Sequence, residues 1–301
     1  MAESIGLIER AAALLRQREA AEIGLPAARP LAPAPEPDRV ADDAAPELVL
    51  DRGRLASFGI PLPSSERSRT VEEFRLIKRN LMTEWSAGRV GDQRPGRIIM
   101  VTSARPGEGK TFTAINLALA FASERDVKAL LVDLDTQHSA LKSILGIYGE
   151  KGIVDVLAGD RDLSDALVRT NIANLLVLPA GQGGPQVPEL FSSNRMAALM
   201  NEATRRYPDR FIILDTPPCM VSSDAATLAP LVGQIVFVVE AHRTQQDEIE
   251  AGLSMLSSCP RISLLLNKSE MASAHFGSYG YGYNYPGGEG HGLRSDKTAP
   301  A

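Results

Sequence analysis

Six continuous apolar runs, separated by stretches with helical spacing, organise the middle of the chain. The apolar runs cover residues 97–103, 128–135, 174–180, 210–215, 234–240 and 261–267. Because they do not alternate apolar with polar positions, they are typical of strands covered on both faces. Helical spacing is found between them, for example over 110–123, 189–206 and 243–258. This alternation predicts an α/β fold with a mostly parallel sheet, helices on both faces and ligands at the carboxyl ends of strands.

The two ends of the chain differ from this middle region, which we place at residues 69–270. Residues 1–68 begin with a short amphipathic pattern and continue into a Pro- and Ala-rich stretch that predicts an extended linker. The apolar positions of the amphipathic pattern are Ile5, Ile8, Ala12 and Leu15. They fit either a frayed end or a docking helix for a partner or a neighbouring subunit. Residues 271–301 are rich in Gly and Ser without apolar periodicity, which predicts a disordered tail.

Composition excludes some classes of function. A net charge of −5 over 301 residues provides no global attraction to nucleic acid, so we expect no nucleic-acid partner. No apolar run reaches the ~20 residues that span a bilayer, and the N-terminus has no secretory signal pattern. We therefore expect a cytoplasmic protein whose membrane role would need a partner. The two cysteines, Cys219 and Cys259, are interpreted as buried small apolar residues.

The segment "SARPGEGKT", residues 103–111, carries the main chemical motif. It lies between a strand and a helix and fits the P-loop pattern small-x-x-x-x-Gly-Lys-Thr. Glycines let backbone N–H groups wrap phosphates, Lys110 would reach the β- and γ-phosphates, and Thr111 would bind Mg²⁺. The positive end of the following helix points at the same anion. We expect ATP and Mg²⁺ as cofactors, with these nucleotide-binding residues: Arg105, Pro106, Gly107, Glu108, Gly109, Lys110, Thr111 and Phe112.

Acidic side chains follow two of the other strands. Asp133 and Asp135 end "LLVDLD", and spacing by two puts both carboxylates on one side of an extended chain. One could hold the metal while the other takes a proton from an incoming hydroxyl. Asp215 ends "FIILDTPP" and is the expected Walker B acid, which orders the Mg²⁺ shell. Asn267 ends the last strand and fits either recognition of the adenine edge or a turn.

Tyrosines are concentrated in the C-terminal tail. Four of the six in the chain fall within seven residues: Tyr279, Tyr281, Tyr283 and Tyr285. A phenol is a poor nucleophile until its proton is removed, so its phosphorylation requires an aspartate beside the γ-phosphate. A Gly-rich tail with tyrosine at every second position could present each ring in turn as a phospho-acceptor.

Together, "SARPGEGKT", "LLVDLD", "ILDTPP" and "YGYGYNY" resemble the bacterial tyrosine kinases, the autokinases of capsule and exopolysaccharide export. The resemblance covers about residues 70–285 and is strongest to the stand-alone form found with exosortase-associated operons. It implies an ATP-dependent protein-tyrosine kinase that phosphorylates its tail in trans. The catalytic residues would be Lys110, Asp133, Asp135 and Asp215, with Asp133 as the base. The metal residues would be Thr111, Asp133 and Asp215.

The resemblance also implies partners. The activator would be a membrane polysaccharide co-polymerase that recruits the kinase to the inner membrane, and a cognate tyrosine phosphatase would reverse its action. A homo-oligomer such as a ring would assemble through a Glu-x-x-Arg-x-x-Arg helix. Here "VEEFRLIKRNL" supplies Glu72, Arg75 and Lys78, whose spacing by three indicates one helical face.

Some positions depart from the family pattern and keep alternatives open. Gln137 stands where the family usually has an Arg, which removes a cation near the phosphates. Arg105 stands where partition-type ATPases carry a signature lysine, and it could imitate that cation across a dimer. His138, a lone histidine, is interpreted as a surface residue. The alternatives are a partition-type P-loop ATPase switch and a non-catalytic regulator. The tyrosine cluster favours the kinase, since a switch has no need of it.

Overall fold

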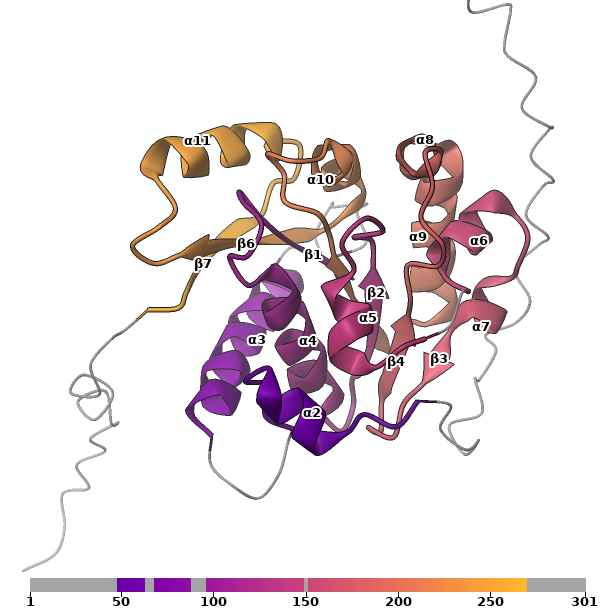
Figure 1. Ribbon diagram of the computed structural model, residues 1–301, viewed down its shortest axis with the longest axis horizontal. Helices are drawn as coiled ribbons and strands as arrows, with labels where there is room; N and C mark the ends of the chain where they lie inside the picture. The colour runs from indigo at the N-terminus through magenta and orange to yellow at the C-terminus, as the bar shows by residue number, and fades with distance from the viewer. Residues whose placement is uncertain (1–47, 63–67, 88–95, 149–150, 270–301) are drawn as a thin grey trace, which may run out of the picture. The chain divides into compact units, whose positions relative to one another are not determined.

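A computed structural model describes residues 48–62, 68–87, 96–148 and 151–269 of the chain (Figure 1). One folded unit ends at Asn267, and Lys268 begins a second unit that includes the tail. The N-terminal amphipathic pattern and the four tail tyrosines lie outside the described residues. In the described part of the chain, no helix combines the length and apolar character needed to cross a membrane.

A seven-stranded sheet forms the centre of the folded unit, in the order β3-β4-β2-β5-β1-β6-β7. The strands are β1 (Ile98–Ser103), β2 (Lys128–Asp133), β3 (Val168–Arg169), β4 (Leu175–Leu178), β5 (Arg210–Asp215), β6 (Gln234–Glu240) and β7 (Ile262–Asn267). All neighbours pair in parallel except β3 with β4. The predicted mostly parallel α/β sheet is confirmed. The antiparallel β3 was missed because two residues are too short to show a pattern.

Helices cover both faces of the sheet, as predicted (Figure 1). On one face lie α2 (Arg52–Ser57), α3 (Arg69–Ala87), α4 (Lys110–Ala122) and α5 (Ala140–Leu145). On the other lie α6 (Ile153–Ala158), α7 (Leu163–Ala166), α8 (Val187–Phe191), α9 (Asn194–Arg206), α10 (Asp224–Leu228) and α11 (Gln246–Met255). Within one strand, Ile98 joins one core and Ile99 the other. This explains why the strands read as continuous apolar runs.

Two predicted helices differ from the observed ones. The expected helix over 189–206 is divided at Ser192 and Ser193, where Ser193 has extended backbone angles before α9. The expected helix over 243–258 is shorter and starts after Gln245, whose backbone N–H donates to the Glu248 carboxylate at 3.0 Å. Serine and such a reciprocal carboxylate bond both favour helix starts over helix interiors.

The folded unit begins earlier than residue 69, which corrects the predicted domain boundary. Leu50, Leu55 and Ile60 are buried in the same core as α3, α4 and α5. Asp51 starts α2 by accepting a 2.6 Å hydrogen bond from the Arg54 backbone N–H. The apolar residues of 48–62 therefore cover the sheet face and are not part of a linker.

Strand register brings the acidic residues together. Asp133 at the end of β2 lies opposite Asp215 at the end of β5, and Asp215 also pairs with Val101 of β1. Strand β1 leads directly into the P-loop. The carboxyl edge of the sheet therefore places two aspartates beside the predicted phosphate-binding loop.

Candidate active site

The P-loop wraps the start of α4 with a backbone that only glycine adopts easily. Gly107 and Gly109 have φ angles of 85° and 100°, in the left-handed region. A Cβ on Gly109 would also lie 2.0 Å from the Asn267 side-chain nitrogen. Both the angle and the close approach therefore require glycine, and Lys110 starts the helix that follows.

Glu108 and Asn267 link the P-loop to neighbouring segments of the chain. Asn267 Nδ2 donates to the Glu108 carbonyl at 2.8 Å. The Glu108 carboxylate is buried and accepts from the Arg105 backbone N–H at 2.7 Å and from the Thr244 hydroxyl. Glu108 therefore directs its charge to the β6–α11 connection. Adenine recognition by Asn267 stays a prediction, and its amide nitrogen already serves the loop.

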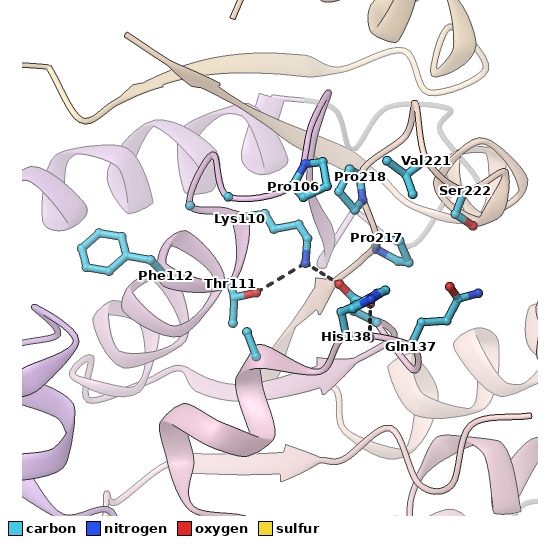
Figure 2. Close-up of a pocket in the computed structure, with 14 residues that line it drawn as sticks. Pro106, Lys110, Thr111, Phe112, Gln137, His138, Pro217, Pro218, Val221 and Ser222 are labelled. Atoms are coloured by element: carbon cyan, nitrogen blue, oxygen red, sulfur yellow. Dashed lines mark hydrogen bonds and ion pairs between the residues drawn. The ribbon is translucent and has the colours of Figure 1, made fainter. Parts of the chain in front are cut away.

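Two other predicted nucleotide-binding side chains have partners within the chain. The Arg105 guanidinium pairs with Glu248 at the start of α11, so action across a dimer would first have to break this pair. Phe112 is among the residues that line the pocket; its ring packs on Phe74 with 5.9 Å between ring centroids and points away from Lys110 (Figure 2). Pro106 lines the pocket beside Lys110.

Lys110 lies among carboxylates. Its Nζ is 2.7 Å from Asp135 Oδ2 and 3.5 Å from the Thr111 hydroxyl (Figure 2). It is also 3.9 Å from Asp215 Oδ1. Burial alone would lower the pKa of Lys110, but the negative charges of Asp215, Asp135 and Asp133 outweigh it and raise that pKa. The ammonium is therefore charged at neutral pH and can exchange Asp135 for a phosphate oxygen.

The acid pair is buried at two depths. Asp135 lines the pocket and accepts from the His138 backbone N–H at 3.1 Å. Asp133 is fully buried behind it and accepts from the Asp135 backbone N–H at 3.1 Å and from the Ser139 hydroxyl. Burial, followed by the charge of Asp215, raises the pKa of Asp133 to about 7 against those hydrogen bonds. A carboxyl group with this pKa suits general-base chemistry near neutral pH.

Asp215 fits the predicted role beside a metal ion. Burial raises its pKa to about 6, while the charge of Lys110 and the Thr111 hydroxyl lower it. Among the described residues, no donor is in full hydrogen-bond geometry with either buried oxygen. A buried carboxylate with unused acceptors next to a hydroxyl is a donor set that suits Mg²⁺. Thr111 and Asp215 could hold the ion directly. Asp133 already accepts hydrogen bonds, so it would contact the ion through a water molecule.

In the part of the chain that the structure describes, no group of three or more His, Cys, Asp or Glu is arranged to hold a metal by itself.

A pocket of about 360 Å³ opens beside Lys110. Besides the P-loop, it is lined by Gln137, His138, Ala140, Pro217, Pro218, Val221 and Ser222 (Figure 2). His138 was interpreted as a surface residue; it is exposed and also lines the pocket. Ser139 was missed altogether. The sequence signal that could have pointed to His138 and Ser139 is their position just after the acid pair, at the start of a helix.

The predicted oligomerisation residues do not share one exposed face. Glu72 and Arg75 form an ion pair in which each side chain is 50% exposed. Lys78 is buried, pairs with Glu124 and donates to the Ala120 carbonyl at 3.3 Å, near the end of α4. Residues six apart lie about 120° apart around a helix, which turns Lys78 inward. A carbonyl-rich helix end also attracts a cation.

Strand order, P-loop, buried acids and the lysine between them define a P-loop nucleotide-binding protein. The family model described as "AAA domain" matches residues 96–241. Tyrosine-protein kinase CpsD of Streptococcus agalactiae is 33% identical to this chain, over 71% of this chain and 90% of the length of CpsD. The chain belongs to the bacterial tyrosine-protein kinase family.

Two further comparisons agree with this assignment. Tyrosine-protein kinase wzc of Salmonella typhimurium is 31% identical over 80% of this chain but 36% of its own length. The crystal structure of the chimerical protein CapA2B2 matches with a TM-score of 0.59 and 26% identity, covering 72% of this chain and 92% of that one. These likenesses support the kinase over the ATPase switch.

Proposed function

We propose that this kinase uses Mg·ATP to phosphorylate the tail tyrosines of a second copy of the chain. The acceptors are Tyr279, Tyr281, Tyr283 and Tyr285. One arrangement carries the proposal: Lys110, Asp135 and Asp133 form one hydrogen-bonded cluster at the pocket. A cation for the phosphates and a proton acceptor for the phenol are therefore side by side, as phosphoryl transfer to a hydroxyl requires.

The chain's own residues have separate tasks in this reaction. Lys110 leaves Asp135 and binds the terminal phosphates, and P-loop N–H groups hold the same anion. Thr111 and Asp215 would hold Mg²⁺, which would neutralise charge on the phosphate oxygens. The acid pair accepts the phenolic proton, and we assign this role to Asp133 because its pKa is about 7. The terminal phosphorus–oxygen bond of ATP breaks as the phenolic oxygen bonds to phosphorus, and ADP leaves.

The test is incubation of the purified chain with Mg·ATP and the activator's cytoplasmic segment, read by phosphotyrosine immunodetection. Lys110→Ala is expected to erase the signal. Deletion of 279–285 is expected to erase autophosphorylation while nucleotide binding is retained. If the wild-type chain hydrolyses ATP and its tail stays unmodified, the switch is the correct class. If it only binds nucleotide, the non-catalytic regulator is correct.

We also propose that a membrane polysaccharide co-polymerase activates this kinase and recruits it to the cytoplasmic face of the inner membrane. The Salmonella relative has most of its length outside the region shared with this chain. The setting would be exopolysaccharide or capsule synthesis, with a tyrosine phosphatase that reverses the modification. The exosortase-associated subtype stays a prediction.

Assembly of a ring through Glu72 and Arg75 is part of the same proposal. Both side chains are half exposed, so a neighbouring copy can reach them. Each phosphate added to the tail carries about −1.5 to −2 charges, and phosphates at every second residue repel one another. We therefore expect the ring to come apart as phosphorylation accumulates. Sedimentation of phosphorylated and phosphatase-treated protein tests this, and equal sizes would refute it.

A further inference from the structure

One tyrosine of the folded unit is displayed to solvent. Tyr148 is 84% exposed and lies outside helices and strands, just after α5. The other tyrosine among the described residues, Tyr207, is 3% exposed. In sequence, Tyr148 is followed by glycine, as are Tyr279 and Tyr281 of the tail. Its phenol is therefore accessible to the active site of another copy.

An arginine lies against this tyrosine and is already aimed at acceptor oxygens. Arg54 of α2 donates through Nε to the carbonyls of Ser143 at 3.0 Å and Ile144 at 3.1 Å, at the end of α5. Its Nη1 is 3.5 Å from the Tyr148 hydroxyl, a long and weak contact. Gly146 has a φ of 74° and leaves room for the guanidinium, which would lie 3.7 Å from a Cβ there.

The Nη1 side of Arg54 matches a phosphate better than it matches a phenol, since Nε and Nη2 already donate to carbonyls of α5. No carboxylate pairs with Arg54 in the described part of the chain. Guanidinium groups bind phosphate oxygens through parallel N–H donors, with charge-assisted bonds stronger than neutral ones. A phosphate on Tyr148 would bring such oxygens to the Nη1 side, which now has only the weak phenol contact.

Further charges surround the same place. Tyr148 lines a cavity of about 980 Å³ together with Lys151 and Arg161. Asp155 and Asp165 also line it. The Asp155 carboxylate is engaged by the Gly152 backbone N–H at 2.7 Å. Two further cations, Lys151 and Arg161, are thus available at the cavity in addition to Arg54, which contacts the Tyr148 hydroxyl.

We propose that Tyr148 is an additional phospho-acceptor on the kinase domain and that Arg54 binds its phosphate. The proposal rests on the proposed function, because that activity supplies Mg·ATP and the catalytic base. The phenolic oxygen bonds to the terminal phosphorus, the bond to the β-phosphate oxygen breaks, ADP leaves, and the proton goes to the acid pair. The active site that modifies Tyr148 belongs to a second copy. In one chain, Ala140 at the start of α5 lines the pocket, whereas Tyr148 follows the C-terminal end of the same helix.

The location connects this modification to the catalytic acids. Ser139 caps the start of α5 and bonds Asp133, while Arg54 caps its end. A phosphate on Tyr148 would add a charge-assisted contact to the hydrogen bonds that Arg54 of α2 already makes at the end of this six-residue helix. We therefore expect the phosphate to be shielded and α2 to be held more firmly when Tyr148 is modified.

The first experiment uses the full chain with the four tail tyrosines replaced by phenylalanine, incubated with Mg·ATP and the activator segment. Peptide mass spectrometry is expected to find phosphate on Tyr148, and Tyr148→Phe in this background should remove the remaining phosphotyrosine. Wild-type protein is analysed in parallel. A phosphorylated tail with an unmodified Tyr148 overturns this proposal alone. No phosphotyrosine anywhere, with ATP hydrolysed, overturns the proposed function as well.

The second experiment tests Arg54 on protein phosphorylated at Tyr148. An added tyrosine phosphatase is expected to remove this phosphate about three- to tenfold faster in Arg54→Gln than in wild type, because a charge-assisted contact is lost. Arg54→Lys keeps the charge without the fork and should fall between them. Arg52→Gln, on the same helix, is the matched control and should resemble wild type. Equal rates in all four proteins would remove Arg54 from the proposal.

Discussion

Replacing Ser139 by alanine tests which carboxylate accepts the phenolic proton. The Ser139 hydroxyl donates to Asp133, and this hydrogen bond lowers the pKa of Asp133. Burial and the charge of Asp215 nevertheless raise that pKa to about 7. The base works only when deprotonated, so activity should rise with pH through this value. Ser139→Ala removes a stabilising contact to the charged form and therefore moves the rise to higher pH.

The size of the shift follows from the strength of the lost bond. A hydrogen bond to a buried charged group contributes about 1.5 kcal/mol, which corresponds to roughly one pH unit. With a midpoint near pH 7, the deprotonated fraction at pH 7 falls from about one half to about one tenth. Phosphotransfer at pH 7 should fall about fivefold, and at pH 9 it should be nearly unchanged.

The assay measures the initial rate of tail phosphorylation at saturating Mg·ATP between pH 5.5 and 9. Ser139 also caps α5, so its loss costs about 1 kcal/mol of stability independently of any base. Ser143→Ala, on an exposed position of the same helix, is the matched control for general damage. A uniform loss at every pH would indicate damage to the helix.

A Ser139→Ala profile that keeps the wild-type midpoint would refute the role of Asp133 as the base. Asp135→Asn then provides the alternative, because Asp135 lines the pocket while Asp133 lies behind it. If activity no longer rises with pH in Asp135→Asn, and the rise stays at its wild-type pH in Ser139→Ala, the base is Asp135.

Three further predictions follow from the same site and its supports. Nucleotide-free Asp215→Asn should be more stable than wild type by about 3 kcal/mol at pH 8 but not at pH 4, in thermal unfolding. The reason is that a carboxyl pKa raised to about 6 makes the folded state lose stability as pH rises from 4 to 6. Thr244→Val leaves a Glu108 oxygen buried and unpaired, and should raise KM for ATP about fivefold with kcat within twofold. Lys78→Ala should lower the unfolding temperature, whereas Arg75→Ala should leave it unchanged and reduce oligomer size in sedimentation.

The phosphate-binding part of the site was predictable because its determinants are local. The glycines, Lys110 and Thr111 are adjacent in sequence between one strand and one helix, and Gly107 and Gly109 have the left-handed angles that the motif needs. The meeting of Asp133 and Asp215 was also predictable, since carboxyl ends of parallel strands share one edge of the sheet.

Features that depend on which neighbour a side chain meets were not predictable. Helical spacing grouped Lys78 with Glu72 and Arg75, but the end of α4 draws Lys78 into the domain. The depth difference between Asp133 and Asp135 likewise comes from tertiary packing around β2. Leu50 lies next to a stretch rich in Pro and Ala, and only the sheet face beneath it shows that its segment belongs to the fold.

The central claim is that one copy's pocket transfers phosphate to the tail of another copy. The direct test mixes a Lys110→Ala chain with an intact tail and an active chain whose four tail tyrosines are phenylalanine, with Mg·ATP and the activator segment. We predict that mass spectrometry will find phosphate on Tyr279, Tyr281, Tyr283 or Tyr285 of the Lys110→Ala chain. ATP turnover by the active chain with no phosphate on those tail tyrosines would contradict the account.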